Sequence, residues 1–248
     1  MSGHSKWATI KHKKGAADKA RGKLFAKLAR QIEVAAKSGG DVDTNPSLRA
    51  AVQKAKAGRM TNDAIDRAIK RGTGDSDGGT YESIMYEGYA PGGVALMIDV
   101  LTDNRNRTGS EIRNVFSKLG GSLAEPGAVS WQFERRGVIL TGEGVDEDEI
   151  MMTALEAGAD DVIAEAGAFR VMTEPSVVYD VKATLDGAGI EVISADSPMV
   201  SDNLVPVTEL SEAKSVLRVL EALEDNDDVQ DVFANFDISD DLMDSATS

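Results

Sequence analysis

The 248-residue sequence contains no cysteine and only two histidines, which excludes several kinds of active site. Without cysteine there are no disulfides, no thiolate metal sites and no thiol nucleophiles. His4 and His12 lie in a lysine-rich segment, where we interpret them as further polar groups and not as zinc ligands. Neither histidine forms part of a Ser-His-acid pattern, and no GxxxxGK[ST] phosphate loop occurs. We therefore expect a protein that is not an enzyme and uses no metal or cofactor.

Long apolar runs are also missing. The densest run, residues 94–101 (VALMIDVL), has the length of a strand and includes Asp99, whereas a membrane helix needs about 18 apolar residues. The N-terminus lacks the apolar core of a secretory signal, and it carries lysine where a mitochondrial transit peptide would carry arginine. These features predict a cytoplasmic protein without a membrane partner or a small-molecule substrate.

Acidic residues are scarce in the first part of the chain, and basic residues are scarce in the rest. Residues 1–72 contain 17 basic and 6 acidic residues, a net charge of +11, whereas residues 73–248 contain 10 basic and 36 acidic residues, a net charge of -26. This separation is typical of a nucleic-acid-binding module attached to acidic domains. The alternative is a basic head that only neutralises its own acidic body.

The basic part of the chain predicts three amphipathic helices. Within residues 16–40, apolar side chains recur at spacings of three and four residues. A second helix begins with Asn45 as N-cap and Pro46 at its first position, and a third covers residues 61–72. Because each helix has one apolar stripe, the three should pack together as a small helical domain.

The acidic part of the chain predicts a mixture of strands and helices. Residues 72–79 (GTGDSDGG) have the composition of a linker. After it, the pattern predicts a hairpin, a helix capped by Thr108 and Glu111, and alternating elements thereafter. Strands are expected at 83–90, 94–102, 128–133, 137–142, 161–166, 168–173, 190–200, 204–207 and 229–236, and helices at 107–121, 146–158, 175–189 and 211–225.

The order of these elements predicts the fold class. Residues 137–200 run strand, helix, two strands, helix, strand, which is a ferredoxin-like unit, and the flanking elements can pair into a second α+β domain. We expect an α+β multidomain protein in which a three-helix domain precedes two ferredoxin-like α/β domains, one inserted in the other. The expected domains are 1–74, 75–133 plus 204–248, and the inserted 134–203. A tandem arrangement would use the same elements.

The N-terminal arm, residues 1–15, holds the first candidate site. Its lysines surround Trp7, whose ring could stack on an unpaired base while the ammonium groups meet phosphates. Trp7 could equally anchor the arm on the protein. The basic charge continues onto the outer face of the first helix. The residues expected to bind nucleic acid on these grounds are Lys6, Trp7, Lys11, His12, Lys13, Lys14, Lys19, Lys23, Lys27 and Arg30.

A second candidate is an anion site at Arg105 and Arg107, just ahead of a predicted helix N-terminus, where the free N–H groups add positive potential. The alternative is that these arginines pair with Asp103 or Glu111. The carboxylate runs at 143–149 and 225–231 are interpreted as solvated faces, because the whole chain is acidic.

Four motifs in order resemble the YebC family, whose mitochondrial members include a translational activator of a cytochrome oxidase subunit. They are GHSKWATIKHKK (3–14), ARGKLFAKLARQI (20–32), YEGYAPGGVA (86–95) and LTDNRNRT (101–108). The resemblance covers nearly the whole chain and implies three domains. It differs at Ala90, where the family usually has glycine, so this turn position should not need a positive φ.

The resemblance implies a cytoplasmic, non-enzymatic regulator of gene expression. The family carries two mechanisms: a DNA-binding transcriptional regulator, and a ribosome-associated factor that binds rRNA and helps synthesis through consecutive prolines. A protein-interaction adaptor that uses the acidic domains is a third alternative. The motif residues that the resemblance carries over are Gly3, His4, Ser5, Lys6, Trp7, Arg105 and Arg107.

Overall fold

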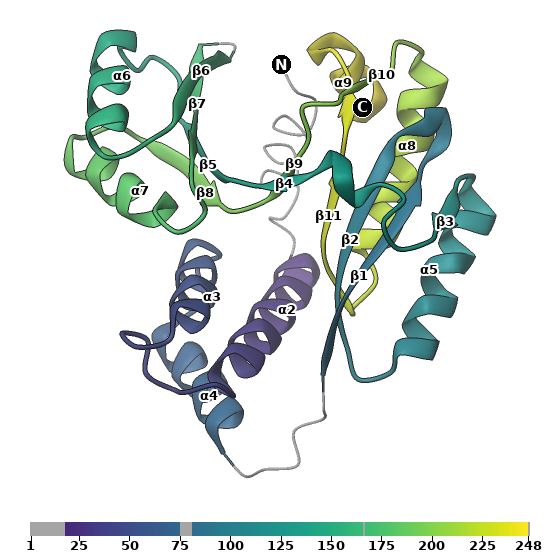
Figure 1. Ribbon diagram of the computed structural model, residues 1–248, viewed down its shortest axis with the longest axis horizontal. Coiled ribbons are helices and arrows are strands. Elements are labelled where there is room, and N and C mark those ends of the chain that lie inside the picture. The colour runs from purple at the N-terminus through teal and green to yellow at the C-terminus, as the bar shows by residue number, and fades with distance from the viewer. Residues whose placement is uncertain (1–17, 75–80, 166, 248) are drawn as a thin grey trace. The chain divides into compact units, whose positions relative to one another are not determined.

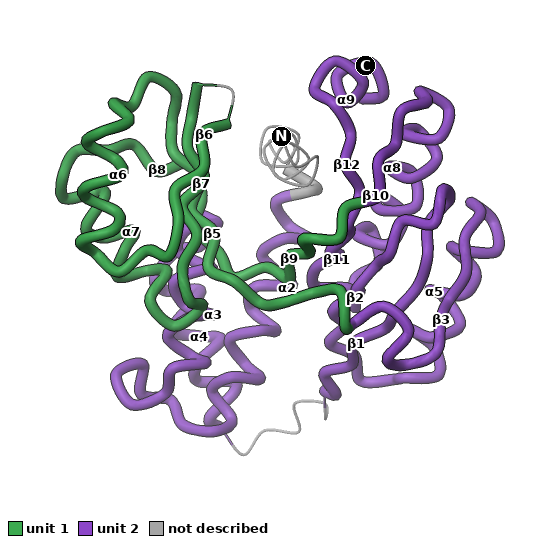
Figure 2. Tube along the Cα trace, turned by 45° about the horizontal axis from the view of Figure 1, so that its top comes forward, with its two compact units in different colours: residues 1, 131–204 green, residues 2–130, 205–248 purple. Residues whose placement is uncertain are grey.

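The computed structural model describes residues 18–74, 81–165 and 167–247. The chain divides into two compact units. One consists of residues 131–204, and the other consists of residues 2–130 together with 205–248 (Figure 2). The first unit is therefore an insertion within the sequence of the second.

The described part of the larger unit begins with three helices: α2 (Asp18–Ala36), α3 (Pro46–Ala57) and α4 (Asn62–Thr73) (Figure 1). Asn45 caps α3 as predicted, since its side chain accepts a hydrogen bond from the N–H of Leu48 at 3.1 Å. The shared core contains Leu28, Ile32, Leu48, Val52 and Ile65. The predicted three-helix domain is thus confirmed.

A four-stranded antiparallel sheet forms the rest of the larger unit. Its strands are β1 (Glu82–Tyr89), β2 (Ala95–Thr102), β3 (Ser122–Ala124) and β11 (Val229–Ala234), in the order β11-β2-β1-β3. Helices α5 (Arg105–Leu119) and α8 (Leu210–Glu224) share the core of this sheet (Figure 1). The hairpin β1-β2 occupies the centre of the sheet, and the connections differ from the βαββαβ order of the inserted unit.

Smaller elements complete the larger unit. Short strands β10 (Val205–Pro206) and β12 (Phe236–Asp237) pair in parallel, and α9 (Asp240–Thr247) follows them. The turn of the central hairpin is a 3-10 segment, η1 (Pro91–Gly93), in which Gly92 has φ 75°. Ala90 has φ -80°, so alanine fits at the position where the resemblance expects glycine.

The inserted unit is ferredoxin-like, as predicted. Its elements are β5 (Gly137–Thr141), α6 (Glu147–Glu156), β6 (Asp161–Glu165), β7 (Ala168–Thr173), α7 (Val178–Gly187) and β8 (Val192–Asp196). The antiparallel order β6-β7-β5-β8 places the first and third strands at the centre. Strand β4 (Glu134–Arg135) precedes these elements in the chain and β9 (Met199–Val200) follows them, and the two short strands pair in antiparallel fashion. The α+β class with one α/β domain inserted in the other is confirmed, whereas the exact domain boundaries stay a prediction.

Three local predictions were wrong. Residues 128–133 do not form a strand. Residues Ser130–Gln132 make the 3-10 segment η2, and the third strand in the chain is β3, which joins the four-stranded sheet of the larger unit. The cause is Glu87, whose buried carboxylate accepts the N–H groups of Gly127, Val129 and Ser130 at 2.7, 2.7 and 3.0 Å. These donors are therefore not available to a sheet.

The other two corrections concern helices. Helix α5 begins at Arg105 with Asn104 as its N-cap, so Thr108 and Glu111 do not form the predicted capping box. Thr108 is buried in the first turn and turns its hydroxyl towards Asp228. Helix α9 was not predicted, because Met243 is its only fully buried residue and its apolar pattern is short.

Candidate nucleic-acid interface

Helix α2 presents a row of three cations. Lys23, Lys27 and Arg30 are spaced by four and three residues, which places them on one face of the helix. Leu28 and Ile32 on another face are buried in the helical core. The packing of α2 therefore fixes the direction in which the three basic side chains point. The sequence pattern predicted that they share a face, but it predicted an outer face, whereas they contact residues 224–228 of the same unit.

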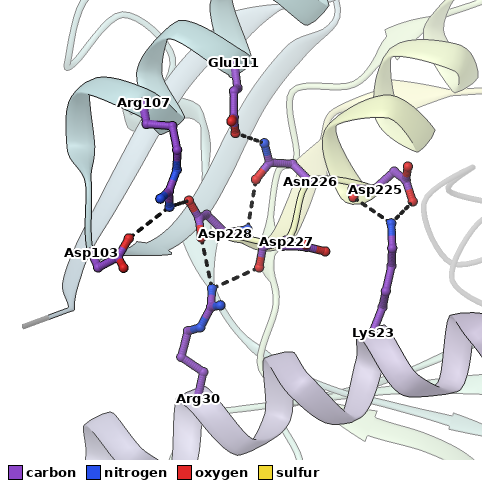
Figure 3. Close-up of a pocket in the computed structure, with 9 residues that line it drawn as sticks. All are labelled: Lys23, Arg30, Asp103, Arg107, Glu111, Asp225, Asn226, Asp227 and Asp228. Carbon is purple, nitrogen blue, oxygen red and sulfur yellow. Dashed lines mark hydrogen bonds and ion pairs between the residues drawn. The ribbon is translucent and has the colours of Figure 1, made fainter. Parts of the chain in front are cut away.

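The row of cations contacts the acidic loop, which we define as Glu224–Asp228, between α8 and β11. The Lys23 Nζ lies 2.5 Å from the Oδ1 of Asp225 and 3.1 Å from its backbone oxygen. The Lys27 Nζ donates to the backbone oxygen of Glu224 at 2.7 Å. Because the last carbonyls of a helix have no partner within it, the two lysines satisfy the negative end of α8. Figure 3 shows Lys23 with its partner Asp225.

Arg30 contacts the end of the acidic loop that leads into β11. Its guanidinium donates to the Oδ1 of Asp228 and to the backbone oxygen of Asp227, both at 3.1 Å. It also lies 5.0 Å from the centre of the Tyr81 ring, within range of a cation–π contact. Nearby, Lys54 of α3 pairs with Asp231 of β11 at 2.7 Å. The helical domain thus meets the acidic sheet domain through matched charges.

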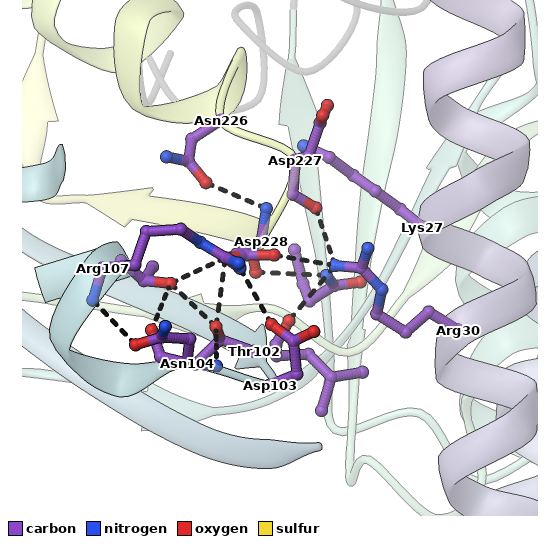
Figure 4. A network of polar contacts seen from close by, with 12 residues as sticks. Lys27, Arg30, Thr102, Asp103, Asn104, Arg107, Asn226, Asp227 and Asp228 are labelled. Atoms are coloured by element: carbon purple, nitrogen blue, oxygen red, sulfur yellow. Dashed lines mark hydrogen bonds and ion pairs between the residues drawn. The ribbon is translucent and has the colours of Figure 1, made fainter. Parts of the chain in front are cut away.

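Asp228 is the centre of a polar network that joins α2, β2 and α5 (Figure 4). Its Oδ2 accepts hydrogen bonds from Thr108 at 2.6 Å, Arg107 at 2.6 Å and Thr102 at 3.1 Å. The residue is only 6% exposed. Asn226 ties the loop down further, because its side chain accepts the N–H of Asp228 and donates to Glu111 at 2.7 Å.

The protonation of Asp228 follows from this network. Burial alone would raise the pKa of Asp228, but the hydrogen bonds from Thr108, Arg107 and Thr102 outweigh it and hold that pKa below its ordinary value. The Asp225 carboxylate, through its hydrogen bond, raises the pKa of Lys23. Asp228 and Lys23 are therefore both charged at neutral pH.

A polar cavity of about 550 Å³ opens between α2, α5 and the acidic loop. Three cations line it, Lys23, Arg30 and Arg107, facing a larger number of carboxylates (Figure 3). Within residues 18–74, 81–165 and 167–247, no group of three or more metal-ligating side chains is placed to hold an ion. No helix in this described part of the chain is long and apolar enough to cross a membrane.

Comparison with known proteins gives the chain its relatives. Residues 5–75 match the family model described as the TACO1/YebC protein N-terminal domain, and residues 81–236 match the model described as the TACO1/YebC second and third domain. The chain belongs to the TACO1/YebC family. The two matched ranges together cover most of the sequence.

Relatives within the TACO1/YebC family align over the whole chain. A protein of Halothermothrix orenii is 55% identical over 251 residues, which cover 100% of this chain and 99% of the relative. One of Rubrobacter xylanophilus is 56% identical, with 98% of each chain covered. Both are named "Probable transcriptional regulatory protein". The crystal structure of a conserved hypothetical protein from Aquifex aeolicus has a TM-score of 0.78 at 44% identity, and the match covers 90% of this chain and 93% of that one.

The structure places the residues predicted for nucleic-acid binding in this TACO1/YebC chain as follows. Lys23, Lys27 and Arg30 share one face of α2. The sequence analysis did not predict their contacts with the acidic loop. Lys19 belongs to α2, but its side chain is not described. The arm residues lie outside the described residues, and their role stays a prediction: Gly3, His4, Ser5, Lys6, Trp7, Lys11, His12, Lys13 and Lys14.

The second predicted site is partly occupied by the protein itself. Arg107 pairs with Asp103 at 3.0 Å and with Asp228 at 2.6 Å, so the alternative that it pairs with Asp103 is seen in the structure. Arg105, at the first position of α5, is exposed, and its guanidinium has no partner among the described residues. An anion site at this helix start stays a prediction that would rest on Arg105 more than on Arg107.

The sequence analysis missed two buried carboxylates that each hold several polar partners. The run 225–231 was interpreted as a solvated face, but Asp228 is buried and holds two arginines. Glu87 is the other, and its N–H partners hold its pKa below the ordinary value although burial would raise it. A signal for Asp228 existed in the motif LTDNRNRT, whose Thr102, Arg107 and Thr108 all contact it.

Proposed function

We propose that this TACO1/YebC protein is a non-enzymatic regulator of gene expression that binds nucleic acid through its basic N-terminal domain. The observation that carries the proposal is the separation of charge, +11 in residues 1–72 against -26 in the remainder. The names of the relatives, transcriptional regulators, point to the same class of function. The cation row on α2 supports it further, because it holds two carboxylate oxygens and a backbone oxygen in the structure.

Binding to RNA is the second candidate, and the charges on α4 favour it over binding to duplex DNA. Helices α3 and α4 are joined by a turn of four residues, residues 58–61, as in a helix-turn-helix. In that motif the second helix enters the major groove of DNA. The exposed face of α4, however, presents Asp63 and Asp66 beside Arg67 and Lys70, and the two carboxylates would oppose the phosphates of a duplex.

The ribosome offers an RNA target that suits this distribution of charge. A basic arm can enter a crevice of folded RNA, where bases are unpaired and stack on aromatic rings. The acidic domains would then face away from RNA or meet basic proteins. In this form of the proposal the protein assists translation, and in the first form it acts on promoters.

Equilibrium binding of the full chain to a labelled 20-base-pair DNA and to an RNA hairpin tests the proposal. With about six phosphates neutralised, affinity for duplex should fall roughly 1,000-fold between 50 and 200 mM salt. The triple variant Lys11→Ala, Lys13→Ala, Lys14→Ala should bind more weakly and with a shallower salt dependence.

A matched control removes three cations from the acidic part of the chain. Lys118, Lys214 and Arg218 are exposed, and their replacement by alanine changes the net charge equally. Equal losses of affinity in the two triple variants would contradict the proposal. Sedimentation with ribosomes at physiological salt, against retention on one promoter fragment, then separates the RNA form from the DNA form.

A further inference from the structure

The acidic loop and nucleic acid require the same side chains. Lys23, Lys27 and Arg30 direct their charged groups at oxygens of the loop, over distances of 2.5 to 3.1 Å. These are the distances at which ammonium and guanidinium groups hold phosphate oxygens. A cation that donates to the loop is to that extent unavailable to a phosphate.

We propose that the acidic loop, Glu224–Asp228, is an internal competitor that covers the cation row of α2 until a nucleic acid displaces it. The inference rests on the proposed function and adds its regulation. The partner of the exposed row is a sugar-phosphate backbone, because a row of cations one helical turn apart recognises repeated negative charge and not a base sequence. The free protein therefore binds polyanions more weakly than its N-terminal charge implies.

The contacts have the strength of a reversible competitor. The side chain of Lys23 is 35% exposed and that of Asp225 is 76% exposed, so water screens their attraction. Lys27 donates to the neutral backbone oxygen of Glu224, and an ammonium group forms stronger hydrogen bonds with a charged phosphate oxygen. Exposed pairs of this kind contribute little individually, and incoming phosphates can replace them.

The loop itself stays in place when α2 releases it. Asp228 keeps Arg107, Thr102 and Thr108 as partners, and Asn226 keeps its hydrogen bond to Glu111. Only Arg30 leaves the buried carboxylate. The loop is thus anchored on α5 and β2, and exchange frees the Asp225 carboxylate from Lys23 without unfolding the sheet domain.

Salt dependence distinguishes exchange from simple attraction. A free cation that neutralises a phosphate releases a counterion from the nucleic acid. When the same cation leaves a carboxylate of the protein, that carboxylate attracts a cation from solution and offsets the release. Removing the carboxylate of Asp225, which Lys23 must leave, should therefore steepen the plot of log affinity against log salt by up to about one unit.

The experiment compares the full-length protein with the variant Asp225→Asn, Asp227→Asn. Both residues are exposed, so the fold should survive. The control variant, Glu209→Gln, Asp241→Asn, changes the net charge equally and alters exposed residues outside the cavity. The probe is a 20-nucleotide RNA hairpin, titrated between 50 and 300 mM salt, with the triple lysine variant of the arm measured in parallel.

We expect the loop variant to bind about 5- to 10-fold more tightly than the wild-type protein, with a steeper salt dependence, and the control to change less than 2-fold. Equal gains in the loop variant and the control would show an effect of net charge and overturn the proposal. A loop variant that binds like the wild type, while the arm variant binds more weakly, would also overturn it and leave the proposed function intact. If none of the proteins binds the probe, the proposed function fails and the exchange fails with it.

Discussion

Replacing Asp228 with asparagine should destabilise the larger unit more than any other single removal of charge from the cavity. The carboxylate is buried and accepts hydrogen bonds from Thr102, Thr108, Arg30 and Arg107. Asparagine keeps one acceptor oxygen but turns an NH₂ group towards these donors. Both arginines retain other partners, Asp103 for Arg107 and backbone oxygens for Arg30. We therefore expect a loss of about 2–3 kcal/mol, at the low end for a broken buried ion pair.

Thermal unfolding followed by circular dichroism measures this loss. For a protein of this size, about 2–3 kcal/mol lowers the melting temperature by roughly 5–10 °C. The matched control is Asp103→Asn, which removes the same charge from a side chain that is 49% exposed and should cost no more than about 0.5 kcal/mol. Equal melting temperatures for Asp228→Asn and the wild type, or an equal loss in the control, would refute the reasoning.

The same pair of proteins gives a pH test. The pKa of Asp228 is lower in the folded protein than its ordinary value. Its contribution to stability is therefore complete above the ordinary carboxyl pKa, and it is lost as the pH falls through the lowered pKa. The stabilities of the wild type and Asp228→Asn should begin to converge as the pH falls below about 4, and they should meet only below the lowered pKa of Asp228. A difference that stays constant down to pH 2 would mean that the charge of Asp228 does not stabilise the network.

Two further substitutions test the hairpin and its neighbouring turn. Glu87→Gln should cost about 2 kcal/mol, because one of its oxygens no longer accepts the N–H groups of residues 127–130, and hydrogen exchange at these amides should accelerate while amides in the inserted unit do not change. Ala90→Gly should lower stability by about 1 kcal/mol, since Ala90 is buried at φ -80° and glycine adds freedom to the unfolded chain; a rise in melting temperature would contradict this.

Elements whose determinants are local could be predicted from the sequence. Asn45 and Pro46 start α3, Asp146 starts α6, and Pro91 with the following glycines turns the central hairpin. The periodicity of the inserted segment was sufficient to predict a ferredoxin-like unit. In each case the residues that decide the conformation lie within a few positions of one another.

Elements decided by distant partners could not be predicted. Residues 128–133 have the alternation of a strand, but the carboxylate of Glu87, 42 and 43 positions earlier, accepts the N–H groups of Val129 and Ser130. Thr108 has the spacing of a capping residue, but its hydroxyl is bound by Asp228, 120 positions later. The same holds for the candidate interface: the sequence predicts the cation row of α2, while the loop that covers it becomes visible only when the fold brings residues 23–30 and 224–228 together.

The proposed function requires that nucleic acid contacts the basic N-terminal domain. Ultraviolet crosslinking of the full-length protein to bound RNA, followed by mass spectrometry of the crosslinked peptides, locates the contact. We expect crosslinks in residues 1–37, with Trp7 among them if its ring stacks on a base. Crosslinks confined to residues 81–248 would contradict it.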